Sequence, residues 1–192
     1  MIYNPGESSK EISVKVMTAD IDEIELIEMG CTGILNKLRV GKSLSAEEMR
    51  EAEDLECVEK IDLRTVGRIL TNSDGQIEVV YRENENDPDL KTFTRIIFSP
   101  NTPSLVAIIK RGAVQSSLSF EEGKRHVCTY VTPYMPFKVH VSASKVDNRL
   151  LEDGILHLEY VLCIDDTAPR HFVVSIEIKE TPEDVFKKYF KD

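Results

Sequence analysis

Residues 155–179, ILHLEYVLCIDDTAPRHFVVSIEIK, decide the fold of this chain. Apolar side chains recur there at every second position on both sides of a Pro- and Asp-bearing turn: Leu156, Leu158, Tyr160, Leu162 and Ile164, then Phe172, Val174, Ile176 and Ile178. The positions between them, such as His157, Glu159, Ser175, Glu177 and Lys179, are mostly polar. A period of two is typical of strands that bury one face and wet the other. The stretch therefore predicts two strands, at about 155–164 and 171–179.

The same alternation extends through most of the chain before residue 180. Ile12, Val14 and Val16 begin it, and residues 63–70 and 77–81 follow as a hairpin around a turn at 72–75. Further strands are predicted at about 92–98, 104–111, 116–121, 126–132 and 137–143. About nine strands with short links must close or pair into two sheets, since free edges invite aggregation. We expect one mainly β domain over residues 1–192, folded as an antiparallel up-and-down barrel.

An acidic segment at residues 20–59 interrupts the strands. It contains twelve acidic and four basic residues, and so carries −8 of the net charge of −10. Ser45 and Glu48 form an S-x-x-E capping box, and Leu44 is placed to pack on Met49. These signals predict a helix over about 46–57 whose narrow apolar stripe is Ala46, Met49, Ala52 and Leu55.

Residues 21–39 allow two interpretations. Apolar residues follow helical spacing after Asp20-x-x-Glu23, but Gly30 and Gly33 interrupt them; the apolar set is Ile24, Ile27, Cys31, Ile34, Leu35 and Leu38. The alternative is a strand, because Ile24-Glu25-Leu26 faintly echoes Ile61-Asp62-Leu63. We expect a helix.

The end of the chain predicts a further helix at about 182–191. Thr181 is a suitable cap, Pro182 fits the first helical position, and Glu183 and Asp184 favour the positive end of the helix dipole. Its apolar side should lie on the barrel wall or plug one end of the barrel.

Composition excludes several classes of protein. With 24 basic against 34 acidic residues, the chain should repel a phosphate backbone, so we expect no nucleic-acid partner. We expect neither a signal peptide nor a membrane-spanning segment, since the opening residues lack a basic flank followed by an apolar run and no long apolar run occurs in the sequence. The four cysteines form no C-x-x-C pair, which favours reduced thiols in the cytoplasm.

Several short motifs follow one another at suitable spacing: Tyr81-x-Glu83, Thr92-x-Thr94, Arg111-Gly112-Ala113-Val114, Phe120-Glu121-x-Gly123 and Tyr130-x-Thr132-Pro133-Tyr134, followed by Tyr160. This run resembles the YwiB-like family of uncharacterised bacterial proteins. The resemblance covers about residues 60–179 and the opening strand, and it implies a calycin-like (lipocalin-like) barrel in a cytoplasmic setting, with no assigned activity.

Two departures from the family pattern stand out. The glycine usual after Thr-Pro-Tyr is Met135 here, which puts the turn geometry at that corner in doubt. The acidic segment is longer than the family's usual first link, so no role for it is implied by the resemblance.

The candidate ligand-binding residues are Tyr81, Glu83, Thr94, Arg111, Tyr130, Thr132, Tyr134 and Tyr160. If Tyr81 faces inward, a period of two also brings Glu83 inward, and Leu105, Ala107 and Ile109 would carry Arg111 inward in the same way. Charges inside an apolar barrel must be paired or solvated, so these two can orient the polar end of a ligand. The alternative is that both strands end there and the charges form a structural pair at the rim.

Other chemistry has weaker support. His126 and Cys128 share one side of a strand and offer two metal ligands, but no third ligand has a recognisable spacing, and His140, His157 and His171 look outward-facing. The serines at 116, 117 and 119 have no G-x-S-x-G elbow. We expect no metal, no cofactor and no catalytic site.

The leading hypothesis is a non-enzymatic barrel that binds a small apolar or amphipathic ligand in its interior. The second is a protein-interaction or regulatory module acting through residues 44–57, with Met49, Leu55 and nearby carboxylates as the contact surface. An enzyme of unrecognised type comes third. Whether the interior is hollow stays open at this point, since side chains can also fill a barrel of this size.

Overall fold

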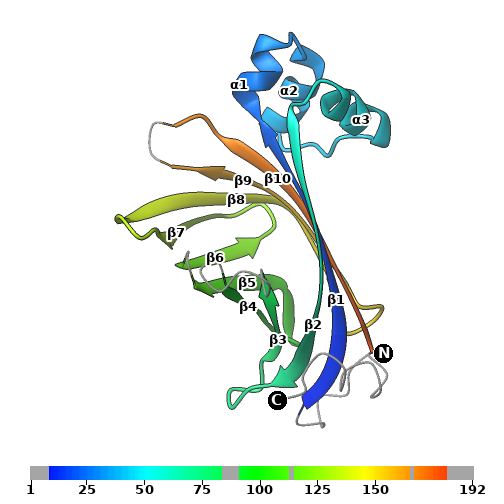
Figure 1. Cartoon of the computed structure of the whole chain (residues 1–192), viewed down its shortest axis with the longest axis vertical. Helices are drawn as coiled ribbons and strands as arrows, with labels where there is room; N and C mark the ends of the chain where they lie inside the picture. The colour runs from blue at the N-terminus through cyan, green and yellow to red at the C-terminus, as the bar shows by residue number, and fades with distance from the viewer. Residues whose placement is uncertain (1–8, 84–90, 113–114, 165–166, 181–192) are drawn as a thin grey trace.

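The computed structural model describes residues 9–83, 91–112, 115–164 and 167–180 (Figure 1). These residues form a closed antiparallel barrel in the order β1-β10-β9-β8-β7-β6-β5-β4-β3-β2, so each strand pairs with its neighbours in sequence and β1 closes on β10. The mainly β prediction and the closed barrel are confirmed. The helix predicted at 182–191 lies outside the described residues.

Ten strands make up the described barrel: β1 (Ser9–Asp22), β2 (Val58–Thr71), β3 (Ile77–Glu83), β4 (Thr92–Ser99), β5 (Thr102–Gly112), β6 (Gln115–Glu121), β7 (Arg125–Val131), β8 (Pro136–Arg149), β9 (Ile155–Cys163) and β10 (Arg170–Glu180). β1, β2 and β8 are each 14 residues long and extend beyond the predicted strands. β1 pairs with β2 from Val58 to Leu70, whereas β3 pairs only with Gly67–Thr71.

Gly67 marks the point where β2 meets β3. A Cβ atom there would lie 2.4 Å from the carbonyl oxygen of Val80 and 3.1 Å from the Cβ of Tyr81. Any other residue would therefore push the two strands apart beside Tyr81.

Three helices occupy residues 23–54: α1 (Glu23–Glu28), α2 (Thr32–Arg39) and α3 (Ala46–Asp54). Figure 1 shows them gathered at the end of the long β1–β2 ribbon. The predicted capping box of α3 is present, because the Glu48 amide donates to the Ser45 hydroxyl at 3.2 Å and the Ser45 amide donates to the Glu48 carboxylate at 2.9 Å. α3 ends at Asp54, three residues earlier than predicted.

The single helix expected over 21–39 is two helices. Asp22, not Asp20, caps α1, since its carboxylate accepts from the Ile24 amide at 2.8 Å. Gly30, with φ of +73°, turns the chain before α2 begins. The predicted apolar stripe is correct in α2, but in α1 Leu26 is buried while Ile24 and Ile27 are exposed, because the break at Gly30 rotates α1 relative to α2.

The helices and the barrel have separate apolar cores. The insertion core contains Ile21, Leu26, Cys31, Ile34, Leu35, Leu38, Ala52 and Cys57, with Leu44, Met49 and Leu55 packed against it. The barrel core follows the inward positions of the strands, including Ile77, Val79 and Tyr81, which face inward as predicted.

The barrel has two halves that we distinguish by their hairpins. The packed half holds the β2–β3, β4–β5, β6–β7 and β8–β9 turns; the cavity half holds the insertion, the β7–β8 turn and the opposite ends of the other strands. Apolar side chains fill the packed half, among them Ile12, Ile69, Ile77, Ile96, Leu150, Leu156, Leu158 and Ile178, all 0% exposed. The candidate site lies in the other half.

Candidate functional site

A cavity of about 500 Å³ occupies the cavity half of the barrel. Its deeper wall is formed by apolar side chains such as Val16, Val139 and Ile176. Nearer the strand ends, four charged side chains take part in the lining: Asp20, Glu83, Lys110 and Arg170. The volume is within the range of small-molecule sites, about 300–1,000 Å³.

Six aromatic side chains line this cavity: Tyr81, Phe120, Tyr130, Phe137, Tyr160 and Phe172. Two pairs of them are cross-strand neighbours that stack on one another. The ring centroids of Tyr160 and Phe172 lie 5.0 Å apart, and those of Tyr130 and Phe137 lie 5.2 Å apart. A third contact joins strands that are not neighbours: the rings of Phe120 on β6 and Tyr160 on β9 lie 4.8 Å apart, so the aromatic side chains pack both along the wall and across the interior.

Arg170 forms an ionic cluster with the end of β1. Its Nε and a terminal nitrogen donate to the two carboxylate oxygens of Asp20 at 3.0 and 2.8 Å, and its other terminal nitrogen donates to Asp22 at 2.9 Å. The hydrogen bonds to Asp20 raise the pKa of Arg170 further above its already high ordinary value. Asp22 also caps α1, so one carboxylate joins the cavity mouth to the insertion.

Glu83 forms a second ionic cluster on the opposite side of the cavity. Lys110 Nζ lies 2.9 and 3.0 Å from the two Glu83 carboxylate oxygens, and the Thr94 hydroxyl donates to one of them at 2.7 Å. Tyr81 lies directly across the β3–β4 ladder from Thr94, and burial raises the pKa of its hydroxyl. The carboxylate is thus held by a cation and a neutral donor at once.

Two tyrosine hydroxyls face this cavity without a hydrogen bond to any described residue, those of Tyr130 and Tyr160. Burial raises the pKa of both, so each stays a neutral O–H at physiological pH. A tyrosine hydroxyl both donates and accepts, so these groups can bind a polar atom placed among the aromatic rings.

Residues 45–176 match the DUF1934 family, described as a domain of unknown function. The chain belongs to this family. The matched segment begins at Ser45 and so includes α3 and β2 through most of β10. No curated protein matches the sequence.

The fold of this DUF1934 chain is similar to a solved structure titled "Crystal structure of ywiB protein from Bacillus subtilis". The match has a TM-score of 0.56 and 14% sequence identity, and it covers 89% of this chain and 93% of that one. The resemblance to YwiB-like proteins is therefore confirmed, together with the barrel. The narrower calycin-like description stays a prediction.

Within this DUF1934 barrel, four of the eight predicted ligand residues line the cavity: Tyr81, Glu83, Tyr130 and Tyr160. Thr94 is 0% exposed and does not line the cavity, but its hydroxyl donates a hydrogen bond to the Glu83 carboxylate. The structure thus brings five of the predicted residues together in one half of the barrel.

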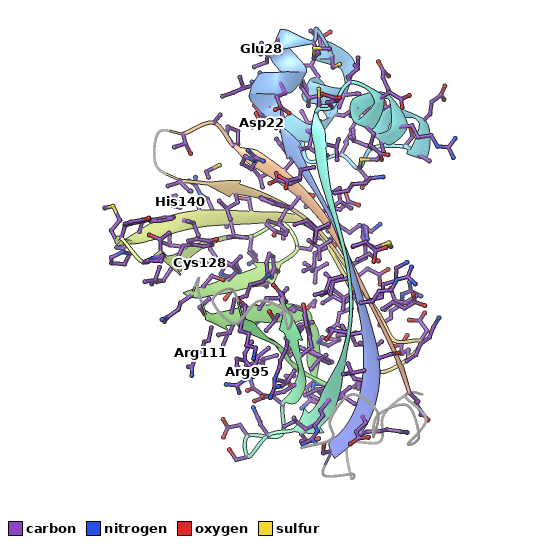
Figure 2. All side chains as sticks on the ribbon, viewed as in Figure 1. Asp22, Glu28, Arg95, Arg111, Cys128 and His140 are labelled. Atoms are coloured by element: carbon purple, nitrogen blue, oxygen red, sulfur yellow. The ribbon has the colours of Figure 1, made fainter. Side chains whose placement is uncertain are left out.

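Arg111 does not belong to this group, and its predicted inward orientation is wrong. The inward positions of β5 are Val106, Ile108 and Lys110, so Arg111 projects from the outer wall opposite Phe93 (Figure 2). Both faces of β5 are apolar in sequence, so the alternation could not tell them apart. Lys110 takes the place predicted for Arg111 as the partner of Glu83.

Thr132 and Tyr134 also lie outside the cavity. The Thr132 hydroxyl accepts from the amides of Tyr134 and Met135 and donates to the Met135 carbonyl, which closes the β7–β8 hairpin. Tyr134 is 95% exposed at its tip. Met135 fits this turn, because its φ is not positive.

Sequence reasoning missed Lys110, Asp20 and Arg170 as lining residues. Asp20 had been assigned to a helix start, and Arg170 follows Pro169 at the beginning of its strand. Asp20 shares the inward face of its strand with Val16, and Arg170 shares that of its strand with Val174. This spacing by an even number of residues is the sequence signal that could have placed them in the cavity.

The histidines behave differently from one another. His171 faces out of the barrel as predicted but is buried beneath the insertion, where its Nε2 lies 2.6 Å from a carboxylate oxygen of Glu23. Arg39 donates twice to the other Glu23 oxygen, at 3.1 and 3.0 Å. His126 and Cys128 do share the inner face of β7, but no group of three or more His, Cys, Asp or Glu within the described part of the chain is placed to hold a metal ion.

The insertion also contacts the outer wall of β9. Burial acts to raise the pKa of Glu159, but its hydrogen bonds to Ser43 and His157 outweigh this and lower it. Met49 and Leu55, named above as contacts for a partner, are partly buried and pack against the insertion core. No described helix is long or apolar enough to cross a membrane.

Proposed function

We propose that this protein is a non-enzymatic binding protein that holds a small, largely apolar molecule in the cavity half of the barrel. The observation that carries the proposal is the cavity of about 500 Å³, lined by six aromatic rings and by two tyrosine hydroxyls that have no described protein partner. Aromatic walls with a few fixed polar groups are typical of small-molecule sites.

The chemistry of the lining favours binding over catalysis. The described lining includes no histidine and no cysteine, and its one serine, Ser116, lies opposite Lys110 on the β5–β6 ladder, where the ammonium is held by the Glu83 carboxylate. A nucleophile needs an adjacent base or a lowered pKa, whereas burial raises the pKa of the lining residues Tyr81, Tyr130 and Tyr160. The four charged groups engage one another.

The test uses N-phenyl-1-naphthylamine, an uncharged aromatic probe whose fluorescence rises in apolar surroundings. Wild-type protein should bind it saturably, and Val174→Trp, which places a large ring in the cavity wall, should weaken binding at least about tenfold. Ser175→Trp is the matched control, since the next residue of β10 faces the outside of the barrel. Circular dichroism checks that each variant is folded, and Leu118→Phe is a milder blocking variant. Absence of saturable binding to the wild type, or equal binding to a folded Val174→Trp, would contradict the proposal.

A second candidate is a surface for a protein partner on the insertion. Ile24, Ile27 and Met29 are 51%, 53% and 51% exposed around α1, in the most acidic region of the chain. A partner held there would be indifferent to Val174→Trp, and this separates the two candidates.

A further inference from the structure

The charges around the cavity determine which molecules it can hold. Two acidic and two basic side chains line it, and every one of them is in an ion pair with another: Asp20 with Arg170, and Glu83 with Lys110. Asp22 adds a third carboxylate, on the same guanidinium. The described ionic groups at the cavity therefore carry one net negative charge.

Among the described lining residues, an anionic head group would meet only cations that are already paired with carboxylates. Arg170 already donates to three carboxylate oxygens, and Lys110 lies between both oxygens of Glu83. An anion beside either cation would also lie beside the carboxylates that the cation already holds, and these would repel it. The net charge of −10 on the whole chain acts in the same direction.

The groups that remain for recognition are neutral. They are the aromatic rings, the hydroxyls of Tyr130 and Tyr160, and the hydroxyl of buried Ser116. Rings along the wall favour flat aromatic surfaces by offset stacking and edge-to-face contact. Hydroxyls favour an oxygen or nitrogen that does not require a counter-ion.

We propose that the cavity selects uncharged, flat aromatic molecules that carry a hydrogen-bonding oxygen or nitrogen, and that its paired charges exclude anionic amphiphiles such as fatty acids. This inference rests on the proposed binding function and adds the ligand class to it. The two ionic clusters would select against anions, because each described cation in the lining is already paired with a carboxylate.

The experiment compares two probes with one scaffold. N-phenyl-1-naphthylamine is uncharged, and 8-anilino-1-naphthalenesulfonate is the same ring system with a sulfonate. Wild-type protein should bind the uncharged probe at least about tenfold more tightly than the sulfonate, because the sulfonate would lie beside carboxylates that are already paired and would be repelled by them.

Two variants test the cause of the selection. Glu83→Gln keeps an acceptor for Thr94 but frees the Lys110 ammonium, so affinity for the sulfonate should rise about tenfold while affinity for the uncharged probe changes little. Lys110→Met is the matched control, because it removes the cation at the same cluster and should leave the sulfonate binding weak. Thermal melts confirm that both variants are folded.

The outcomes separate the two proposals. Equal or tighter binding of the sulfonate by the wild type, or a folded Glu83→Gln variant that gains nothing for the sulfonate, overturns the ligand class and leaves the binding function intact. Failure of both probes to bind the wild type overturns the binding function itself.

Discussion

The two halves of the barrel share one closed ladder of strands but differ in what their inward side chains do. In the packed half, residues such as Ile69, Leu156 and Leu158 reach across the interior and are fully buried. In the cavity half, rings stack on the neighbouring strand and charged groups pair along the wall. The comparison shows that closing a barrel does not by itself fill it: a cavity of about 500 Å³ remains in one half, although Phe120 and Tyr160 contact each other between non-adjacent strands there.

Truncating one leucine in each half tests this difference most strongly. Leu158→Ala should lower the free energy of unfolding by about 2–5 kcal/mol, because it opens a void in a filled interior. Leu162→Ala, on the same strand but in the cavity wall, should cost only about 1 kcal/mol, since it removes less contact and creates no new void. Urea unfolding followed by circular dichroism measures both. Equal losses would mean that the cavity half is packed as tightly as the other.

The contact between the insertion and the cavity half should have a smaller effect on stability. His171→Leu leaves one buried oxygen of Glu23 without its partner, and we expect a loss of about 1–3 kcal/mol. His157→Leu is the control, because His157 contacts the carboxylate of Glu159 from a more exposed position of the outer wall and should cost less than about 1 kcal/mol. Hydrogen exchange should show the loss at His171 as faster opening of α1. If the two variants are equivalent, Glu23 is held by Arg39 alone.

The smallest expected effect is the response of the insertion to acid. Hydrogen bonding to Lys37 and to the Ser45 amide lowers the pKa of Glu48 from 4.5 to about 2. Because the folded pKa is the lower one, this stabilisation of α3 is complete above about pH 4.5 and is lost as the pH falls towards 2. The apolar side chains that fill the packed half carry no ionisable group, so their packing should not change over this pH range. Carbon-13 NMR titration should give the low pKa for Glu48, and Lys37→Met should raise it towards 4.5; a wild-type midpoint near 4.5 would refute the expectation.

Strand pattern and caps could be predicted from the sequence because they depend on local chemistry. The alternation in β9 and β10, the turn at Gly75 and the capping box at Ser45 all appear as expected. The inward face of β5 could not be predicted, since Leu105, Ala107 and Ile109 are as apolar as Val106 and Ile108. The inward face of β5 is decided by the register of the β4–β5 ladder, in which Lys110 lies opposite Thr94. This register depends on contacts between strands and cannot be read from β5 alone.

About half of the candidate site could be predicted from the sequence, for the same reason. Tyr81, Glu83, Tyr130 and Tyr160 sit on strands whose phase is clear from their neighbours, and they line the cavity. Asp20 and Arg170 come from opposite ends of the chain and meet only because β1 closes on β10. Thr132 and Tyr134 belong to the same motif as Tyr130, but the strand ends before them.

The helical insertion leaves and rejoins the barrel at a single rung of the ladder. Ile21 on β1 pairs with Val58 on β2, and the Asp22 amide donates to the Cys57 carbonyl at 3.3 Å, so the chain returns to the position from which it departed. The segment is therefore an insertion in the β1–β2 hairpin. Its length can vary among relatives without shifting the register of any strand. A shorter insertion would expose Ile21 and His171, which the helices now bury. Relatives with a shorter insertion should therefore carry different residues at these two positions.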